Sequence, residues 1–169
     1  MEFLRGTEDN LFSTLAGLLF TPTKQILDKV EAFKKEHFMN KFVVGLQVRS
    51  IGPNKAKRIP NFFDCYDSIM GVDNRRRLDV VFYLATDSDK TRKELVEQYP
   101  QHQIIFYNET VTRETDAGNF AAIVDIWLLS QSDLLIVSGG STFGRVAYTL
   151  GSHLPFVVPT EYELRNYEI

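Results

Sequence analysis

The chain has 169 residues and a mass of 19.4 kDa, a length that suits one ordinary domain able to bury a core without disulfide or metal support. Its single cysteine, Cys65, excludes a disulfide framework and a multi-cysteine zinc site, and its 3 scattered histidines argue against a histidine cage. The net charge of −3 and the pI near 5.6 argue against a general nucleic-acid binder, which needs a basic surface.

Segments with helical and strand-like patterns alternate along the chain. A helix is predicted over residues 23–38, where apolar side chains recur at helical spacing after Thr21-Pro22. Short, almost unbroken apolar runs predict buried strands at residues 41–49, 78–85, 103–107, 134–138 and 154–158. Further helices are expected at residues 62–70, 88–99, 119–130 and 141–150, with Ser88 as an N-cap. A basic, proline-bounded loop is expected at residues 52–60.

Apolar strands that alternate with helices predict an α/β fold: a doubly wound, mainly parallel, Rossmann-like sheet covered on both faces. We expect a single domain over residues 1–169, with a helical lead-in at 1–40 and the Rossmann-like core at 41–158. In such sheets, ligands bind beyond the carboxyl ends of the strands. The residues of interest therefore follow the strands: Arg49-Ser50, Thr86-Asp87, Asn108-Glu109 and Gly139 to Thr142.

The strongest local feature is the stretch from Ile136 to Gly144, in which a buried strand ends in small residues that open a helix. Gly140 lets the backbone approach a ligand closely, and the helix N-terminus offers free N–H groups. The hydroxyls of Ser141 and Thr142 add donors, so this turn could hold a diphosphate. The alternative is a simple helix cap. The stretch lacks the Gly-Lys-Ser/Thr ending of a P-loop, which argues against a kinase or an ATPase.

Two arginines are candidates for contact with phosphate. Arg49 ends an apolar strand at the predicted ligand edge, where a guanidinium can pair with phosphate oxygens and stabilise a leaving diphosphate. The alternative for Arg49 is a strand-terminal side chain that points into water. Arg145, one turn into the glycine-led helix, ranks lower because its side chain is expected to face a neighbouring acid or solvent.

Two aspartates are candidates for the rest of a ligand. Asp125 lies in an almost wholly apolar helix and needs a partner, because an unpaired buried carboxylate is costly. The partner is either the N–H donors of a purine such as guanine or an internal salt bridge, perhaps with Arg145. Asp87 follows the second strand and either orients a sugar or ribose hydroxyl or caps the helix that begins near Ser88.

Taken together in this order, the segments resemble the nucleotide-sugar half of fucosyltransferases. The stretch from Val124 through Tyr148 resembles the corresponding segment of α1,6-fucosyltransferases. Gly45-Leu-Gln-Val-Arg49 and Ser141-Thr-Phe-Gly144 are closer to the plant xyloglucan fucosyltransferase group, and Leu84-Ala-Thr-Asp87 is similar to a segment in both. The likeness runs from about Val43 to Leu150, which is most of the chain.

The resemblance implies a GDP-fucose site in the C-terminal Rossmann-like domain of a two-domain GT-B glycosyltransferase. Carried over by position, the resemblance implies that Arg49 holds the β-phosphate and that Ser141 and Thr142 hold the diphosphate. It further implies that Asp125 accepts hydrogen bonds from guanine with help from Gln47. The predicted donor-site residues are thus Gln47, Arg49, Asp87, Asp125, Gly140, Ser141 and Thr142, with Arg49 as the catalytic one.

The same resemblance implies an inverting, metal-independent transferase in which a glycan hydroxyl displaces GDP from fucose, with no cofactor. The α1,6 group has a His-x-Arg-Arg pattern, whereas Gln47 and Ser50 stand here, which favours the xyloglucan-type branch or a divergent relative. No residue maps onto a catalytic base, so the base and the acceptor pocket are expected in an N-terminal partner domain.

Localisation follows from the resemblance as well. Fucosyltransferases of this kind imply the Golgi or secretory pathway and glycan or cell-wall biosynthesis. The sequence has no apolar run long enough to cross a bilayer and no signal-peptide pattern. The chain as written is therefore expected to be soluble, with membrane attachment through a segment absent from it.

Two other interpretations stay open from the sequence. The first is a catalytically inactive module of the same fold that still binds a nucleotide sugar; the missing base and the short length favour it. The second is an unrelated doubly wound domain, flavodoxin-like or receiver-like. Such domains need a flavin loop or an acidic cluster that the sequence lacks.

Overall fold

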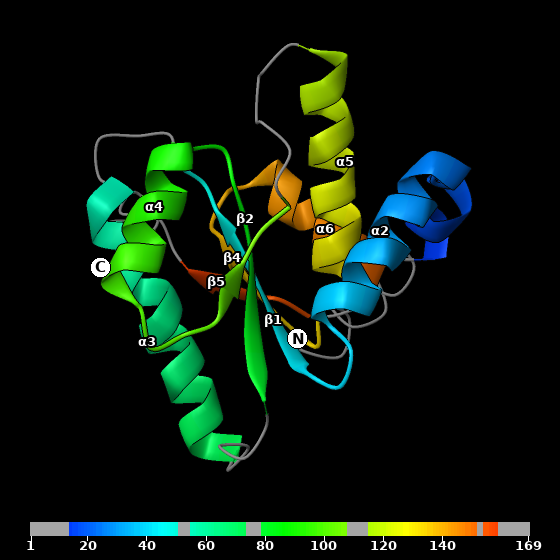
Figure 1. Cartoon of the computed structure of the whole chain (residues 1–169). Coiled ribbons are helices and arrows are strands. Elements are labelled where there is room, and N and C mark those ends of the chain that lie inside the picture. The colour runs from blue at the N-terminus through cyan, green and yellow to red at the C-terminus, as the bar shows by residue number, and fades with distance from the viewer. Residues whose placement is uncertain (1–13, 51–54, 74–78, 108–114, 152–153, 159–169) are drawn as a thin grey trace, which may run out of the picture.

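A five-stranded parallel sheet forms the centre of the protein (Figure 1). The computed structural model describes residues 14–50, 55–73, 79–107, 115–151 and 154–158. The strands have the order β3-β2-β1-β4-β5, and every neighbouring pair is parallel. Their bounds are β1 Phe42–Val48, β2 Val80–Thr86, β3 Ile104–Ile105, β4 Leu134–Ser138 and β5 Phe156–Val158. The predicted doubly wound, parallel α/β fold is confirmed.

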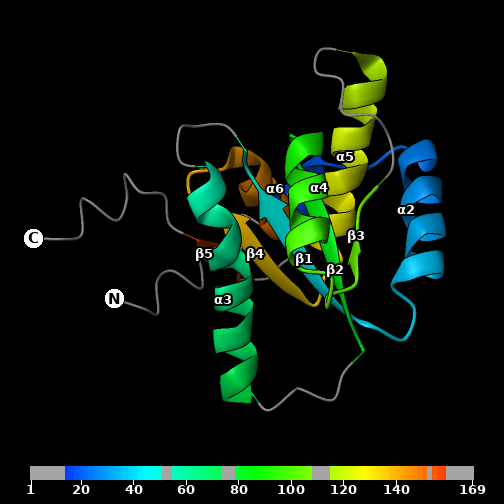
Figure 2. The same ribbon diagram turned by 60° about the vertical axis from the view of Figure 1, so that its left-hand side comes forward.

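Helices cover both faces of the sheet (Figures 1 and 2). One face carries α2 (Lys24–His37), α5 (Asp116–Ser130) and α6 (Thr142–Gly151), and we call it the α5 face. The other carries α3 (Lys55–Asp73) and α4 (Asp89–Gln98), and we call it the α3 face. The two faces enclose separate hydrophobic clusters, which explains why the central strands are apolar at almost every position.

Register fixes which side chains share a face. In the β1–β2 ladder Gly45 lies beside Tyr83 and Gln47 beside Ala85, and in the β1–β4 ladder Gln47 lies beside Val137. Because side chains alternate along a strand, these residues all point to the α5 face. The intervening β1 residues, such as Leu46, belong to the cluster on the α3 face.

The prediction of a loop at residues 52–60 is wrong from Lys55 on, because α3 begins there and continues through Pro60. Residues 52–54 lie outside the described residues. Proline removes one helical hydrogen bond but leaves its carbonyl free to accept one. Four aromatic and apolar side chains further along α3 are buried against the sheet: Phe62, Phe63, Tyr66 and Met70. Their burial outweighs the cost of one proline near the start of the helix.

Smaller differences concern the ends of elements. The strand predicted at residues 103–107 is the two-residue edge strand β3, which pairs with β2 on one side. The predicted N-cap of α4 is confirmed, since the Ser88 Oγ accepts from the Thr91 N–H at 3.2 Å. A short helix at residues 14–19 precedes α2.

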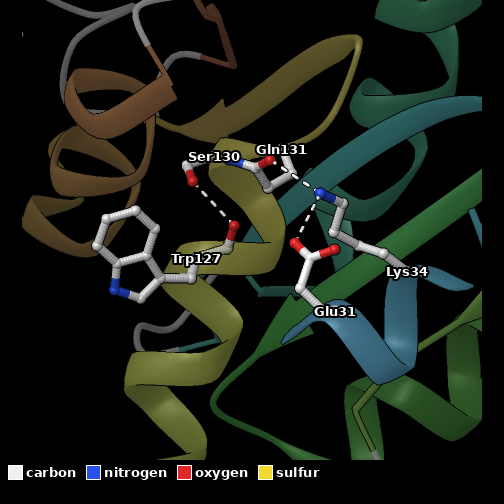
Figure 3. A network of polar contacts seen from close by, with 5 residues as sticks. All are labelled: Glu31, Lys34, Trp127, Ser130 and Gln131. Carbon is white, nitrogen blue, oxygen red and sulfur yellow. Dashed lines mark hydrogen bonds and ion pairs between the residues drawn. The ribbon is translucent and has the colours of Figure 1, made fainter. Parts of the chain in front are cut away.

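One polar contact joins α2 to the end of α5, and further contacts lie within each helix (Figure 3). The Lys34 Nζ donates to the Glu31 Oε1 at 3.1 Å and to the Oε1 of Gln131, the C-cap of α5, at 3.2 Å. In the last turn of α5 the Ser130 hydroxyl donates to the Trp127 carbonyl at 2.8 Å. These contacts complement the burial of Ile26 and Val30, which form the apolar side of α2.

Candidate functional site

The ends of β1 and β4 are joined by one buried hydroxyl. The Ser138 Oγ donates to the Gln47 carbonyl at 3.1 Å and accepts from the Arg49 N–H at 2.9 Å. Ser138 is the last residue of β4, and Arg49 is the first residue after β1. The Arg49 backbone is therefore anchored to the strand that leads into the glycine-led turn, while its side chain is exposed at the carboxyl edge.

The turn between β4 and α6 is shaped by small residues. Gly140 has a φ of +64°, a left-handed conformation that favours glycine. Ser141 is buried, and its Oγ accepts from the Gly144 N–H at 3.4 Å while its carbonyl accepts from the Arg145 N–H at 3.0 Å. Thr142 is exposed at the first position of α6. The Ser141 hydroxyl thus caps α6, as the alternative interpretation of this turn expects. The first turn of α6 faces the same edge of the sheet as Arg49.

Gln47 lies directly below this turn. It is 5% exposed, and its Oε1 has no hydrogen-bond partner among the residues that the structure describes. A Cβ atom at Gly144 would lie 2.9 Å from the Gln47 Oε1 and 2.9 Å from the Val137 Cβ, so Gly144 permits the close approach of α6. A buried acceptor without a donor costs about 1–3 kcal/mol, and a ligand N–H at this position would remove that cost.

A second polar cluster joins the ends of β1 and β2. The Ser50 N–H donates to the Asp87 Oδ1 at 2.8 Å, and the Ser50 Oγ shares hydrogen bonds with the hydroxyls of Thr86 at 3.0 Å and Thr91 at 2.7 Å. The N-cap of α4 is Ser88, and Asp87 holds the chain that follows Arg49. Asp87 is half-buried at the carboxyl edge.

Asp125 lies between α5 and the sheet, 5% exposed. Its Oδ1 accepts a short hydrogen bond from the hydroxyl of Tyr83, in the middle of β2. Among the described residues no ion pair joins Asp125 to Arg145, whose Nε donates to the Tyr148 hydroxyl at 3.2 Å instead. The alternative of a salt bridge between Asp125 and Arg145 is therefore wrong, because the partner of Asp125 is Tyr83.

Burial controls the ionisation of this pair. Desolvation raises the pKa of Asp125 to about 7, against the opposing effects of the Tyr83 hydrogen bond and the positive charge of Arg92. Burial also raises the pKa of Tyr83 well above its ordinary value, and the Asp125 charge adds to that shift. The Tyr83 hydroxyl is therefore the proton donor of the pair.

The described residues hold no group of three or more His, Cys, Asp or Glu side chains arranged to bind a metal ion. Within the same residues, none of the helices has the length and apolar character of a membrane span.

Comparison with known proteins bears on the resemblance stated above. No family model matches the chain. It is 25% identical over 179 residues to putative fucosyltransferase 10 of Arabidopsis thaliana, which covers 89% of this chain and 34% of that protein. It is 39% identical over 74 residues to the α-(1,6)-fucosyltransferase of Drosophila melanogaster, which covers 40% of this chain and 12% of that protein.

Solved fucosyltransferases share the fold. A mutant of Arabidopsis thaliana FUT1 in complex with GDP superposes with a TM-score of 0.62 at 19% identity, over 90% of this chain and 36% of that one. NodZ α-1,6-fucosyltransferase co-crystallised with GDP also gives 0.62, at 20% identity, over 83% of this chain and 45% of that one. The chain is fucosyltransferase-like. It spans about a third of the length of the curated Arabidopsis relatives that it matches.

In this fucosyltransferase-like chain the carboxyl edge brings together most of the predicted donor-site residues. Ser138 and Ser141 connect Arg49 to the glycine-led turn, and Gln47 lies beneath it. Asp125 is placed deeper, on the same face of the sheet as Gln47. Two predicted residues, Asn108 and Glu109, lie outside the described residues. The ligand-binding roles of all these residues stay predictions.

Two residues of this region were missed by sequence reasoning. Tyr83 lies in the apolar run that predicts the strand at residues 78–85, and Arg92 lies in the helix predicted at residues 88–99, but neither pattern assigns them a role. Arg92 is 7% exposed, with its guanidinium 5.0 Å from the Phe106 ring centre and its Nε unpartnered among the described residues. A signal existed for Tyr83, because an aspartate in an apolar helix needs a buried donor and a tyrosine in a facing strand can supply one.

Proposed function

We propose that this chain carries the donor site of a fucosyltransferase that transfers fucose from GDP-fucose to a hydroxyl of a glycan. The observation that supports it best is the anchoring of the Arg49 backbone by Ser138 beside the turn that holds Ser141 and Thr142. This arrangement puts a cation, hydroxyls and the N-terminus of a ten-residue helix at one edge of the sheet. The relatives that carry the word fucosyltransferase in their names, and the solved structures with GDP, agree with this assignment.

In this proposal the diphosphate lies over the β4–α6 turn. The Arg49 guanidinium pairs with the β-phosphate, and the first N–H groups of α6 with the Thr142 hydroxyl hold the remaining oxygens. Gly140 keeps the turn free of a side chain that would block the phosphates. Ser141 contributes by shaping the turn, since its buried hydroxyl already accepts from the Gly144 N–H.

The guanine base lies toward the α5 face. The unpartnered Oε1 of Gln47 accepts one N–H, and the Asp125 carboxylate accepts from the other N–H donors of the ring. Asp87 orients a hydroxyl of the ribose or of fucose at the neighbouring strand end. Guanine carries N–H donors where adenine presents an acceptor, so carboxylate and amide oxygens select GDP over ADP.

The reaction is a single inverting displacement that needs no metal. The acceptor oxygen forms a bond to C1 of fucose while the bond from C1 to the β-phosphate oxygen breaks, and GDP leaves with the electron pair. Arg49 and the α6 N–H groups stabilise the charge that develops on GDP. The acceptor proton passes to a base outside this chain, and an N-terminal domain supplies that base and the acceptor pocket. A Golgi location belongs to the same proposal.

Binding of GDP tests the donor site directly. Titration calorimetry with GDP and GDP-fucose should give saturable binding, and Arg49→Ala should weaken it about ten- to a hundredfold, because a charge-assisted contact with phosphate is lost. Lys24→Ala is the matched control, since this cation is exposed at the start of α2 and pairs with Asp28. Absence of GDP binding at millimolar concentration, or equal losses in both variants, would refute the proposal.

A further inference from the structure

Tyr83 and Asp125 form a buried polar pair that packing alone does not require. Tyr83 is fully buried in the middle of β2, and Asp125 is 5% exposed on the facing side of α5. The hydrogen bond between them uses Oδ1, and no other described residue donates to this carboxylate. A carboxylate can accept several hydrogen bonds, so the second oxygen keeps unused capacity.

The position of the pair links it to the candidate site. Tyr83 lies two residues before Ala85, which is the register partner of Gln47 in β1. The pair and Gln47 therefore point to the same face of the sheet, and Gln47 is nearer the carboxyl edge. Figure 1 shows that the first turns of α5 rise beyond the ends of the strands on this face, where a ligand held by α6 would meet them.

The charged and titratable groups around Asp125 come from several elements. Tyr83 on β2 donates to it, and Arg92 on α4 favours its ionised form. Tyr107, which follows β3, contributes to the raised pKa of Tyr83. On the helices packed against α5, Arg145 bonds Tyr148 within α6, and Lys34 of α2 bonds Glu31 and the C-cap Gln131. Of all these groups, Tyr83 is the one that donates a hydrogen bond to Asp125.

We propose that Tyr83 is a positioning residue of the donor site, whose hydroxyl orients the Asp125 carboxylate so that its second oxygen accepts an N–H of the nucleotide base. This inference rests on the proposed function, because it assigns Asp125 to a bound guanine. Tyr83 itself touches no ligand and acts through Asp125. Its hydroxyl fixes the rotation of the carboxylate and favours the charged form that a base N–H requires.

The inference has a consequence for pH. With a pKa of about 7, the ionised fraction of the Asp125 carboxyl rises about tenfold between pH 6 and pH 8. GDP affinity should therefore rise about tenfold between pH 6 and pH 8. Removing the Tyr83 hydroxyl takes away a bond that favours the anion, so the midpoint should move to higher pH.

Tyr83→Phe tests this with the ring kept in place. GDP affinity should fall about five- to tenfold at pH 7, the usual effect of one lost hydrogen bond, and should recover in part at pH 8.5. Titration of the Asp125 carboxyl by ¹³C NMR in the ligand-free protein should show the same upward movement. Asp125→Asn should remove the step near pH 7 and leave any dependence due to the phosphate of GDP itself, which titrates near pH 6.

Tyr66→Phe is the matched control, because Tyr66 is a buried tyrosine on the α3 face that packs against Phe82. It should change neither GDP affinity nor the midpoint. Replacement of Tyr83 by 3-fluorotyrosine keeps the hydroxyl and the packing but makes the donor more acidic. It should move the Asp125 midpoint to lower pH, which gives a measurement even where Tyr83→Phe folds poorly.

The outcomes separate the two proposals. If the wild-type chain fails to bind GDP, the proposed function falls and this inference falls with it. If the wild-type chain binds GDP but Tyr83→Phe keeps its affinity and midpoint, the donor site stands and the role of Tyr83 is refuted. A variant that binds weakly at every pH with an unmoved midpoint would show that Tyr83 is merely structural, and that also overturns the inference.

Discussion

The two faces of the sheet bury different kinds of side chain. On the α3 face the core is aromatic and apolar, and Phe63 stacks on Tyr99 at 4.0 Å and on His102 at 4.9 Å between ring centres. On the α5 face the core contains the Gln47 amide and the Asp125 carboxylate, both 5% exposed. Aromatic and apolar packing accounts for most of the first face, whose buried polar residues include Thr91 and Arg92 of α4. The second carries polar groups whose burial costs stability.

This difference agrees with the proposed location of the donor site. The Gln47 amide oxygen has no donor among the described residues, and the buried Asp125 carboxyl has a pKa raised to about 7. Both features cost stability in a core that apolar side chains could have filled. They occur on the face that also supports the glycine-led turn and α6. The α3 face stabilises the sheet, whereas the α5 face loses some stability at Gln47 and Asp125, two residues of the proposed donor site.

The largest expected effect concerns the α3 face. Phe63→Ala should lower the free energy of unfolding by about 3–5 kcal/mol, because Phe63 is 3% exposed and contacts Phe82, Tyr99 and His102. Urea denaturation monitored by circular dichroism measures it. GDP affinity of the folded fraction should not change. A large loss of GDP affinity with intact stability would break the distinction between the two faces.

The next effect is a gain in stability on the α5 face. The folded pKa of Asp125 lies near 7, above its ordinary 3.8, so the folded chain holds a proton that the unfolded chain has released. Its contribution is therefore full below pH 4 and is lost as pH rises through 7. Asp125→Asn should raise the free energy of unfolding at pH 8 by up to about 4 kcal/mol and leave it nearly unchanged at pH 4.

Thermal unfolding of both proteins at the two pH values provides the measurement for Asp125→Asn. The same substitution should weaken GDP binding, since the amide cannot accept as the carboxylate does. A variant less stable at pH 8 than the wild type would show that the carboxylate supports the core rather than burdens it.

The smallest effect has the opposite pH dependence. Burial among aromatic rings lowers the pKa of His102, with partial opposition from Asp67. The unfolded chain then binds the proton more readily, so this contribution is present above pH 6.5 and is lost as pH falls below it. His102→Phe should make the unfolding midpoint in urea less sensitive to acid between pH 7 and pH 5. An unchanged sensitivity would contradict the lowered pKa of His102.

Local patterns predicted much of the fold, because they depend on neighbouring residues. The apolar run of β4 gave both of its ends, Leu134 and Ser138, and the Ser88 cap followed from its place before a polar helix. The helix through Pro60 was missed, since its stability depends on burial against distant strands. Sequence rules for proline describe the hydrogen bond that a helix loses, but not the burial of apolar side chains that offsets this loss.

The candidate site was predictable in outline for a related reason. Strand ends converge at one edge in any parallel sheet, so Arg49 and the turn at Gly140 could be expected near each other. The Tyr83–Asp125 bond joins residues 42 positions apart and depends on how α5 rotates over β2. No local pattern determines that rotation, which is why the partner of Asp125 came from the structure.

The anchoring of Arg49 and Ser50 has a consequence for evolution and engineering. Both residues are tied to neighbouring strands, Arg49 by Ser138 and Ser50 by Asp87. The position of the Arg49 backbone is thus set from within the sheet. Substitution of an exposed residue at this edge, such as Thr142, should therefore leave that backbone in place, so the edge can be varied while the anchor stays.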